Sequence, residues 1–361
     1  MLQVLFIFFF CLSIKLGFAL LYYLRLALYK VPTKNNVKNT ENQSVSVIVC
    51  YHNESKNAIS SLHNLSRIKA KNLEIVLVDD MSTDDTFSQL SANLSSIMRV
   101  VQNTTEHKGK KMALSHGINN AKYDWLLMTD ADCRVGEKWV KSMRSMSLDH
   151  QIVLGYAPLD RSKSWIGKFA RYETYYTALQ YLSFALAGRP YMGVGRNLMY
   201  HRNIFDDADG FTSHTDIASG DDDLLINYAA NAVNTTICLD PESFVYSPGK
   251  ETFSSFIRQK TRHVSSSHRY RWVDKLLLGL SSISQMGLYI LAVVLLFSQY
   301  SSWVLLLPAY WLLMMMIQYP ICKKLHSIDL WLLYPVYDMA MAMYYIIMIP
   351  FTFIKKQNTW S

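Results

Sequence analysis

Residues 125–132 read WLLMTDAD, an apolar run that ends in two carboxylates, Asp130 and Asp132, separated by one residue. The run has the length and composition of a short buried strand, with both acids at its carboxyl end. In an open α/β sheet, ligands bind just beyond the carboxyl ends of the strands. Because hard divalent cations prefer carboxylate oxygens, the stretch predicts a metal and a phosphorylated ligand at this edge.

Strand-like and helix-like segments alternate around this run. Strands are expected at 44–50, 73–78 and 125–130, and helices at about 55–67 and 109–120. This alternation predicts an α/β fold with a parallel, doubly wound sheet. Polar side chains then meet at its carboxyl edge: Asn53, Glu54, Asp79, Asp80, Asp130 and Asp132.

Two other Asp-x-Asp patterns occur in the chain. Asp207 and Asp209 lie in a polar stretch before Gly210, which is typical of a turn. The triplet Asp221 to Asp223 precedes the apolar residues 224–226. Only Asp130 and Asp132 follow a strand-like run, so context separates the three patterns.

Long apolar runs flank this segment. Residues 2–24 carry a single charge, Lys15, and are long enough to cross a bilayer. No small-residue cleavage site follows, so a retained anchor is expected over 1–28. About three C-terminal membrane helices are expected within 276–354, although the last run, 328–354, could instead form a re-entrant pair of short segments. The soluble domain would occupy 40–270.

Basic residues flank the soluble domain at 25–38 and 269–275, which predicts a cytoplasmic domain of an integral membrane protein in the inner or plasma membrane. Sequons would suit an exported, glycosylated domain instead, but the charge pattern outweighs them. Five cysteines without metal-ligand spacing indicate neither disulfides nor zinc. The sequons are Asn42, Asn53, Asn64, Asn93, Asn103 and Asn234, and the cysteines are Cys11, Cys50, Cys133, Cys238 and Cys322.

The formal net charge of +8 could indicate nucleic acid as a partner. However, seven Lys or Arg residues cluster in 250–275, beside a membrane run. Membrane lipid headgroups or a diphosphate ligand explain this cluster better, and no nucleic acid is expected. Residues 165–192, rich in aromatic side chains, could lie on the headgroup layer or form a core helix beneath the ligand site.

Seven motifs in a fixed order resemble those of family 2 glycosyltransferases, the inverting GT-A-fold group that includes cellulose, chitin and hyaluronan synthases. The resemblance spans about residues 44–275. The motifs lie at 45–54, 78–84, 109–110, 130–132, 193–197, 220–222 and 259–262.

The resemblance implies roles for the donor and metal residues. Asn53, Glu54, Asp79 and Asp80 would bind the nucleoside, and Lys110 the base or phosphate. Asp80 could instead cap the next helix, and Lys110 could be a solvated lysine. Asp132 would bind Mg²⁺ or Mn²⁺ on the donor diphosphate, with Asp130 on the ribose or reaching the ion through water. Cys133 is a poor ligand for such an ion.

The motif Gly220-Asp221-Asp222 resembles the element that carries the general base in the family. Asp222 is the expected base and Asp221 the fallback, because the acidic triplet permits a shift of one residue. The same acids could simply stabilise a helix N-terminus.

The motif that begins at Gln259 departs from the family pattern, because His263 stands where the family has Trp. Arg262 would clamp the donor diphosphate together with Gln259. The acceptor side would comprise Gly195, Arg196, Asn197 and His263. In the synthases the Trp lines the acceptor channel, so its replacement puts polymerisation in doubt.

The expected activity is an inverting, metal-dependent sugar transfer from a nucleotide-diphosphate sugar, foremost a UDP-sugar, to a lipid-linked or glycan acceptor at the cytoplasmic membrane face. The alternatives are a processive polysaccharide synthase and a non-catalytic sugar-nucleotide-binding membrane module. A nucleotidyltransferase is disfavoured, because no glycine-rich activating loop opens the first strand.

Overall fold

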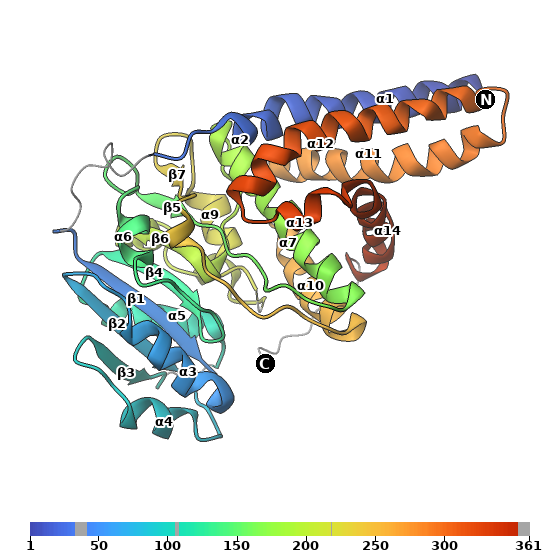
Figure 1. The fold of residues 1–361 in the computed structure, drawn as a ribbon. Coiled ribbons are helices and arrows are strands. Elements are labelled where there is room, and N and C mark those ends of the chain that lie inside the picture. Colours follow the sequence, from blue (N-terminus) through green and yellow to red (C-terminus); the bar gives the residue numbers. More distant parts are fainter. Residues whose placement is uncertain (33–41, 105–107, 218, 353–361) are drawn as a thin grey trace.

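The computed structural model describes residues 1–32, 42–104, 108–217 and 219–352. Its centre is a seven-stranded sheet with the strand order β3-β2-β1-β4-β6-β5-β7 (Figure 1). Three long helices extend away from this sheet, and shorter helices cover its two faces. The α/β class predicted from the sequence is confirmed.

The first four strands run parallel. β1 (Val45–Tyr51) pairs with β2 (Leu73–Asp79) and with β4 (Trp125–Asp130), and β2 pairs with β3 (Met98–Gln102). Three of the four match the predicted strands. The fourth, β3, was not predicted, because it is a short edge strand whose residues are mostly only half-buried.

The sheet is mixed, which corrects the prediction of a parallel sheet for strands beyond the first four. β6 (Leu198–His201) runs antiparallel to both β4 and β5 (Ile152–Leu154), whereas β7 (Thr235–Ile237) runs parallel to β5. Leu198, the first residue of β6, pairs with residues near the carboxyl ends of β4 and β5. The chain therefore enters β6 from the carboxyl edge and must run back along its neighbours.

Side chains of β1 alternate between two cores, as a strand covered on both faces requires. One core contains α3 (Ser55–Ser66) and α6 (Trp139–Arg144), and the other contains α5 (Lys110–Asn120) and α9 (Asp223–Ala229). Two shorter helices are α4 (Thr86–Ala92) and α8 (Arg202–Asp206).

Helix α5 approaches the sheet very closely. A Cβ on Gly117 would come 2.7 Å from a methyl carbon of Ile48. Glycine at this position therefore allows the helix that begins with Lys110 to lie tightly against β1 and β2.

Helix α7 (Trp165–Leu186) decides between the two interpretations of the aromatic segment. Most of its aromatic side chains are buried, including Tyr172 and Tyr181, so α7 is a core helix. Trp165 at its start is the exception, with 72% of its surface exposed. Helix α10 (Phe253–Ser267) joins α7 through a buried ion pair between Lys260 and Glu173.

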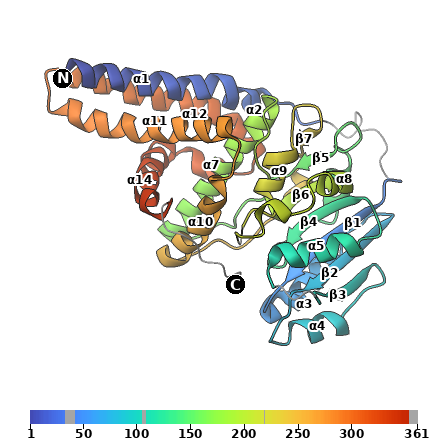
Figure 2. The same cartoon turned by 180° about the vertical axis from the view of Figure 1, so that it is seen from behind.

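Among the residues that the structure describes, three helices are long and apolar enough to cross a membrane: Leu2–Leu28, Trp272–Leu296 and Ser301–Lys324. The first comprises α1 (Leu2–Phe18), a π-helical stretch (Ala19–Tyr23) and α2 (Leu24–Leu28). The second is α11, and the third is a 3-10 turn followed by α12 (Leu306–Lys324). The three lie side by side in both views (Figure 2).

The remaining C-terminal run forms α13 (Ile328–Trp331) and α14 (Tyr334–Thr352). Helix α14 contacts α11 and runs across the three-helix bundle instead of along it (Figure 2). Among the described residues it does not meet the length and hydropathy of a membrane span. The described residues thus contain two C-terminal candidate membrane spans, where about three membrane helices were expected.

The bundle encloses polar side chains. Lys15 on α1 donates to Gln285 on α11 at 2.8 Å and to the Tyr176 hydroxyl on α7 at 3.3 Å. The Gln285 amide donates in turn to the Asp338 carboxylate on α14 at 2.9 Å. Because lipid offers no hydrogen-bond partners, these contacts let four helices bury polar groups together.

Candidate active site

The predicted site residues come from seven segments of the chain, and four of these segments contribute to one pocket at the carboxyl edge of the parallel strands. A pocket opens among Lys110, Asp130, Gly195, Asp221 and Asp222. Its deeper wall is formed by side chains of the sheet and of α5: Ile48, Cys50, Leu114, Met128, Thr129, Leu198 and Tyr200. The fold thus brings the catalytic candidates and one metal candidate to a single cavity.

Lys110 lies between two of the acids. Its ammonium nitrogen is 2.9 Å from an Asp130 oxygen and 3.0 Å from an Asp221 oxygen, and only 22% of its side chain is exposed. Burial opposes the charge, but Asp130 and Asp221 outweigh it and hold the pKa of Lys110 well above its usual value. Lys110 is therefore a buried cation of the site and not a solvated lysine.

Asp130, Asp132 and Cys133 place their ligand atoms within 4.8 Å of one another. Burial raises the pKa of the Cys133 thiol, so this sulfur stays protonated, and it donates to Asp132 at 3.6 Å. Burial and then the charge of Asp130 raise the pKa of Asp132. The two carboxylates fit a hard divalent cation such as Mg²⁺ or Mn²⁺, which would relieve their repulsion.

Asp222 stands at the N-terminus of α9. One of its oxygens accepts from the Gly195 backbone amide at 2.5 Å, and the other from the Asp223 amide at 2.8 Å. Burial, Asp221 and Asp223 together raise the pKa of Asp222 to about 7. Asp222 therefore caps a helix, as the structural interpretation expected, and also has the basicity of a general base.

Asp221 and Asp222 have different surroundings. Asp221 is paired with the ammonium group of Lys110, whereas Asp222 is held by backbone amides. A side chain at position 195 would place its Cβ 3.2 Å from an Asp222 oxygen, so glycine allows this approach. The geometry supports Asp222 over Asp221 as the acid that can accept a proton.

Asp79 and Asp80 have unequal roles in the structure. Asp79 is 1% exposed, and one of its oxygens is buried with no hydrogen-bond partner among the described residues. Asp80 accepts from the Asn103 amide at 2.7 Å and from the Gly109 backbone amide at 2.9 Å, which fixes the start of α5. It does not cap the next helix, because α4 begins after Asp85. Asp79 thus offers the available acceptor.

Asn53 and Glu54 shape the rim of the site. Asn53 has a positive φ of 54° and accepts from the Thr83 backbone amide at 2.8 Å. Glu54 accepts from Asn57 at 2.7 Å. Burial raises the pKa of Glu54, and the charges of Asp132 and Asp130 contribute further.

Two of the predicted acceptor-side residues, Asn197 and Arg196, differ in their contacts. Asn197 is fully buried, and its amide accepts from Trp139 at 2.9 Å and donates to two backbone carbonyls. Its role in the structure is to brace the site. Arg196 donates to Ser247, and its charge acts on Asp130 and Asp132.

Helix α10 carries the remaining predicted residues. The charge of Lys110 lowers the pKa of Asp130, and the charge of Arg262 makes a smaller contribution in the same direction. Arg262 therefore interacts electrostatically with the Asp130 carboxyl of the site. Gln259 is half-buried on the same helix. The side chain of His263 lies outside the described residues.

Two contributions were missed in the sequence. Lys111 is buried and donates to the carbonyls of His214 at 2.5 Å and Ile217 at 2.8 Å, and burial lowers its pKa to about 8. Asp223 accepts from Ser266 and from Tyr270. The run of three acids before a helix indicated that Asp223 could have a structural role. The sequence did not reveal its partners, Ser266 and Tyr270, because they lie more than forty residues away along the chain.

Residues 46–208 match the model described as "Glycosyl transferase family 2". Poly-beta-1,6-N-acetyl-D-glucosamine synthase of Staphylococcus aureus is 27% identical over 116 residues, which are 32% of this chain and 28% of the synthase. Glycosyltransferase GlyG of Streptococcus pneumoniae is 30% identical over 134 residues, which are 36% of this chain and 44% of GlyG. The chain thus matches less than half the length of these curated relatives.

Among solved structures, the mannosyltransferase PcManGT from Pyrobaculum calidifontis, in complex with GDP-Man and Mn²⁺, has a TM-score of 0.57. It is 19% identical, and the match covers 95% of this chain and 99% of that one. At this identity the likeness shows the fold, and it extends over the helices that flank the sheet. Residues 46–208 are thus similar to glycosyl transferase family 2, and the chain has the fold of this solved mannosyltransferase, with candidate membrane helices joined to the sheet.

Proposed function

We propose that the protein is an inverting, metal-dependent glycosyltransferase that moves a sugar from a nucleotide-diphosphate sugar to a lipid-linked or glycan acceptor at the cytoplasmic membrane face. The observation that carries the proposal is the position of Asp222 in the pocket together with its raised pKa. Asp222 lines the pocket, is held by the Gly195 amide, and has a pKa of about 7. A group of this basicity can accept a proton near neutral pH.

The donor would bind along the carboxyl edge. The unpartnered oxygen of Asp79 can accept a hydrogen bond from the nucleobase, and Lys110 and Arg262 can hold the phosphates. Asp130 and Asp132 would hold Mg²⁺ or Mn²⁺, which would neutralise charge on the departing nucleoside diphosphate.

Asp222 would take the proton of the acceptor hydroxyl while that oxygen attacks the anomeric carbon. The bond from this carbon to the diphosphate oxygen breaks as the new glycosidic bond forms, and the nucleoside diphosphate leaves with the electron pair. Because attack and departure occur on opposite faces, the configuration at the anomeric carbon inverts.

A UDP-sugar is the proposed donor, and the identity of the sugar is the first thing to test. The purified full chain in detergent should hydrolyse one member of a panel of UDP- and GDP-sugars in the presence of Mg²⁺ or Mn²⁺. Hydrolysis of a GDP-sugar alone would contradict the UDP assignment. No turnover of any donor, with or without candidate acceptors, would leave the non-catalytic binding module as the better account.

Processive synthesis is a second candidate, favoured by the match to the poly-N-acetylglucosamine synthase. The replacement of the family's Trp by His263 favours single transfer instead. Product length separates the two. A ladder of long products from a single acceptor would support a synthase, whereas a product one sugar longer than its acceptor would support single transfer.

We further propose the arrangement of a membrane anchor at 1–28, a cytoplasmic transferase domain at 40–270 and C-terminal membrane helices at 276–354. The basic flanks at 25–38 and 269–275 support this orientation. Ser91, an exposed position on α4, provides the test. A cysteine placed there should resist an impermeant thiol reagent added to intact cells, and efficient labelling would reverse the topology.

A further inference from the structure

Helix α9 presents a buried polar face that is separate from the pocket. Asp223 and Asn227 lie four residues apart, so they share one side of the helix. Asp223 is 7% exposed and Asn227 is 3% exposed. Both side chains point toward residues 266–274, here called the elbow. The elbow comprises the end of α10, the connection and the first turn of α11.

Asp223 is held by two hydroxyl groups of the elbow. Ser266 donates to one of its oxygens, and the Tyr270 hydroxyl donates to the same oxygen at 2.7 Å. The other oxygen accepts from the Leu224 backbone amide at 2.9 Å. Hydrogen bonds to a buried carboxylate are among the stronger ones, because the charge would otherwise lack compensation.

Asn227 is held one turn later. Its amide donates to Asp274 at 3.0 Å, and its carbonyl oxygen accepts from the Arg271 backbone amide at 2.8 Å. The Arg271 side chain donates to Asp274 at 2.7 Å and to the Pro190 carbonyl at 2.5 Å. Asp274 lies in the first turn of α11, so this cluster joins α9 to the start of a candidate membrane helix.

Helix α9 contains seven residues, from Asp223 to Ala229. A helix this short has little stability of its own, so its orientation depends on what it packs against. Asp222 is its N-terminal cap, and a rotation of α9 would move the Asp222 carboxylate with it.

We propose that Asp223 and Asn227, bound to the elbow, are positioning residues that fix the direction of the Asp222 carboxylate. The inference rests on the proposed function, in which Asp222 is the general base. Its consequence is that the start of α11 and the catalytic acid move as one unit, because the elbow bonds to α9 at two successive turns.

Two matched substitutions test this. Tyr270→Phe removes one hydroxyl that donates to Asp223, and Tyr181→Phe removes one that donates to the Gly155 carbonyl, each at 2.7 Å. Both tyrosines are buried, and the Tyr181 hydroxyl donates to Gly155 and not to a residue of α9. Each substitution therefore removes one hydroxyl group and one hydrogen bond, but only Tyr270→Phe removes a bond between the elbow and α9.

In the full chain in detergent, Tyr270→Phe should lower kcat for transfer on the order of tenfold, since small misplacements of a catalytic group have effects of this size or larger. The affinity for UDP with Mn²⁺ by calorimetry should stay within about twofold, because the donor residues lie on other elements. Tyr181→Phe should change neither. A double variant, Ser266→Ala with Tyr270→Phe, should lower kcat further.

Thermal unfolding measured alongside separates misfolding from mispositioning. If Tyr270→Phe keeps the kcat of Tyr181→Phe, or if kcat and UDP affinity fall together with the folded fraction, the positioning role is wrong. Asp222→Asn serves as the reference. If it still transfers sugar, Asp222 is not the general base and this inference fails with that assignment, whereas an inactive Asp222→Asn beside an unaffected Tyr270→Phe defeats only the inference.

Discussion

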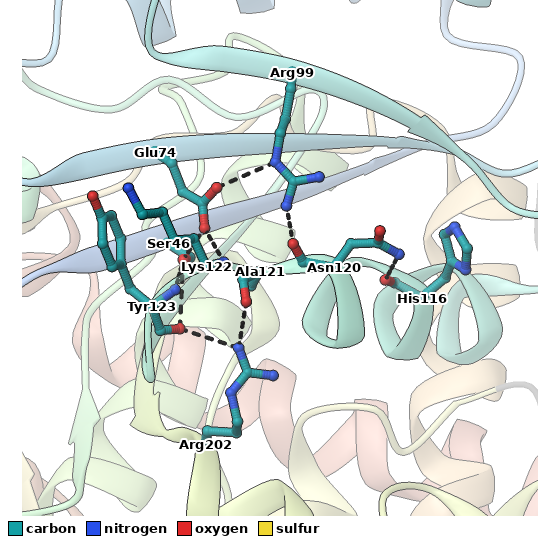
Figure 3. A network of polar contacts seen from close by, with 9 residues as sticks. All are labelled: Ser46, Glu74, Arg99, His116, Asn120, Ala121, Lys122, Tyr123 and Arg202. Carbon is teal, nitrogen blue, oxygen red and sulfur yellow. Dashed lines mark hydrogen bonds and ion pairs between the residues drawn. The ribbon is translucent and has the colours of Figure 1, made fainter.

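The two edges of the parallel strands differ in how their charges are balanced. At the amino edge, Glu74 accepts from Ser46 at 2.5 Å and from Arg99 at 3.2 Å, and also from the backbone amide of Lys122 (Figure 3). Arg202 donates to the carbonyls of Ala121 at 2.7 Å and of Tyr123 at 3.2 Å. Donors and acceptors at this edge satisfy each other.

At the carboxyl edge, Lys110 is paired with Asp130 and Asp221, and the charge of Asp222 also acts on it. The pKa of Asp132 and that of Asp222 lie above their usual values, because burial and neighbouring acids disfavour their charged forms. This edge therefore contains unfavourable charge that a cation or a proton would relieve. The polar groups of the amino edge thus satisfy one another, whereas the carboxyl edge contains acids that a bound cation or a transferred proton would stabilise, as the proposed function requires.

The largest expected effect comes from Asp222→Asn. The amide keeps the shape of the side chain but cannot accept the acceptor proton, so transfer should fall on the order of 10² to 10⁴-fold while donor binding persists. Radiolabelled sugar transfer and UDP calorimetry measure the two. Asp221→Asn is the control for register. An inactive Asp221→Asn beside an active Asp222→Asn would move the base by one residue, and normal transfer by both would refute the catalytic assignment.

Asp132→Ala should remove the metal-dependent part of donor binding. Outer-shell changes at metal sites cost about 10 to 100-fold in affinity, and a direct ligand should cost at least as much. Calorimetry with UDP, with and without Mn²⁺, measures this loss. The thermal midpoint should not fall, because the substitution removes a carboxylate whose pKa burial raises. An unchanged Mn²⁺-dependent affinity would contradict the metal assignment.

The pKa of about 7 at Asp222 predicts a pH dependence with opposite signs for rate and stability. Because only the ionised form accepts a proton, kcat at one pH unit below 7 should be about tenfold lower than its plateau value at high pH. The raised pKa favours the folded state at low pH, and this contribution is lost as the pH rises through 7. The metal-free protein should therefore lose stability between about pH 4 and 7 relative to Asp222→Asn. A flat kcat from pH 5.5 to 8 would contradict this.

Glu74→Ala provides the contrast from the amino edge and the smallest effect on activity. Loss of the carboxylate leaves Arg99 and Ser46 without a shared partner, so the free energy of unfolding should drop by about 1 to 3 kcal/mol. Denaturant unfolding measures the drop, and kcat per folded molecule should stay at the wild-type value. A tenfold lower kcat in the folded fraction would show that the two edges are not independent.

The sequence predicted the carboxyl edge well because its acids directly follow recognisable strands. Asp79, Asp130 and Lys110 lie where local patterns placed them. The antiparallel β6 was not predictable, because its direction depends on where the chain leaves α7. The bracing roles of Asp80 and Asn197 also depend on distant partners, such as Asn103 and Trp139, that no local pattern reveals.

The contact between Lys15 and Gln285 has a consequence for biogenesis. The two residues are 270 positions apart, so a ribosome completes the entire sheet between them. Until α11 and α14 have been synthesised, Lys15 lacks the neighbouring Gln285 amide and Asp338 carboxylate. Completion of this contact therefore requires α11, and a truncated product that lacks α11 would leave the buried Lys15 side chain without its Gln285 partner.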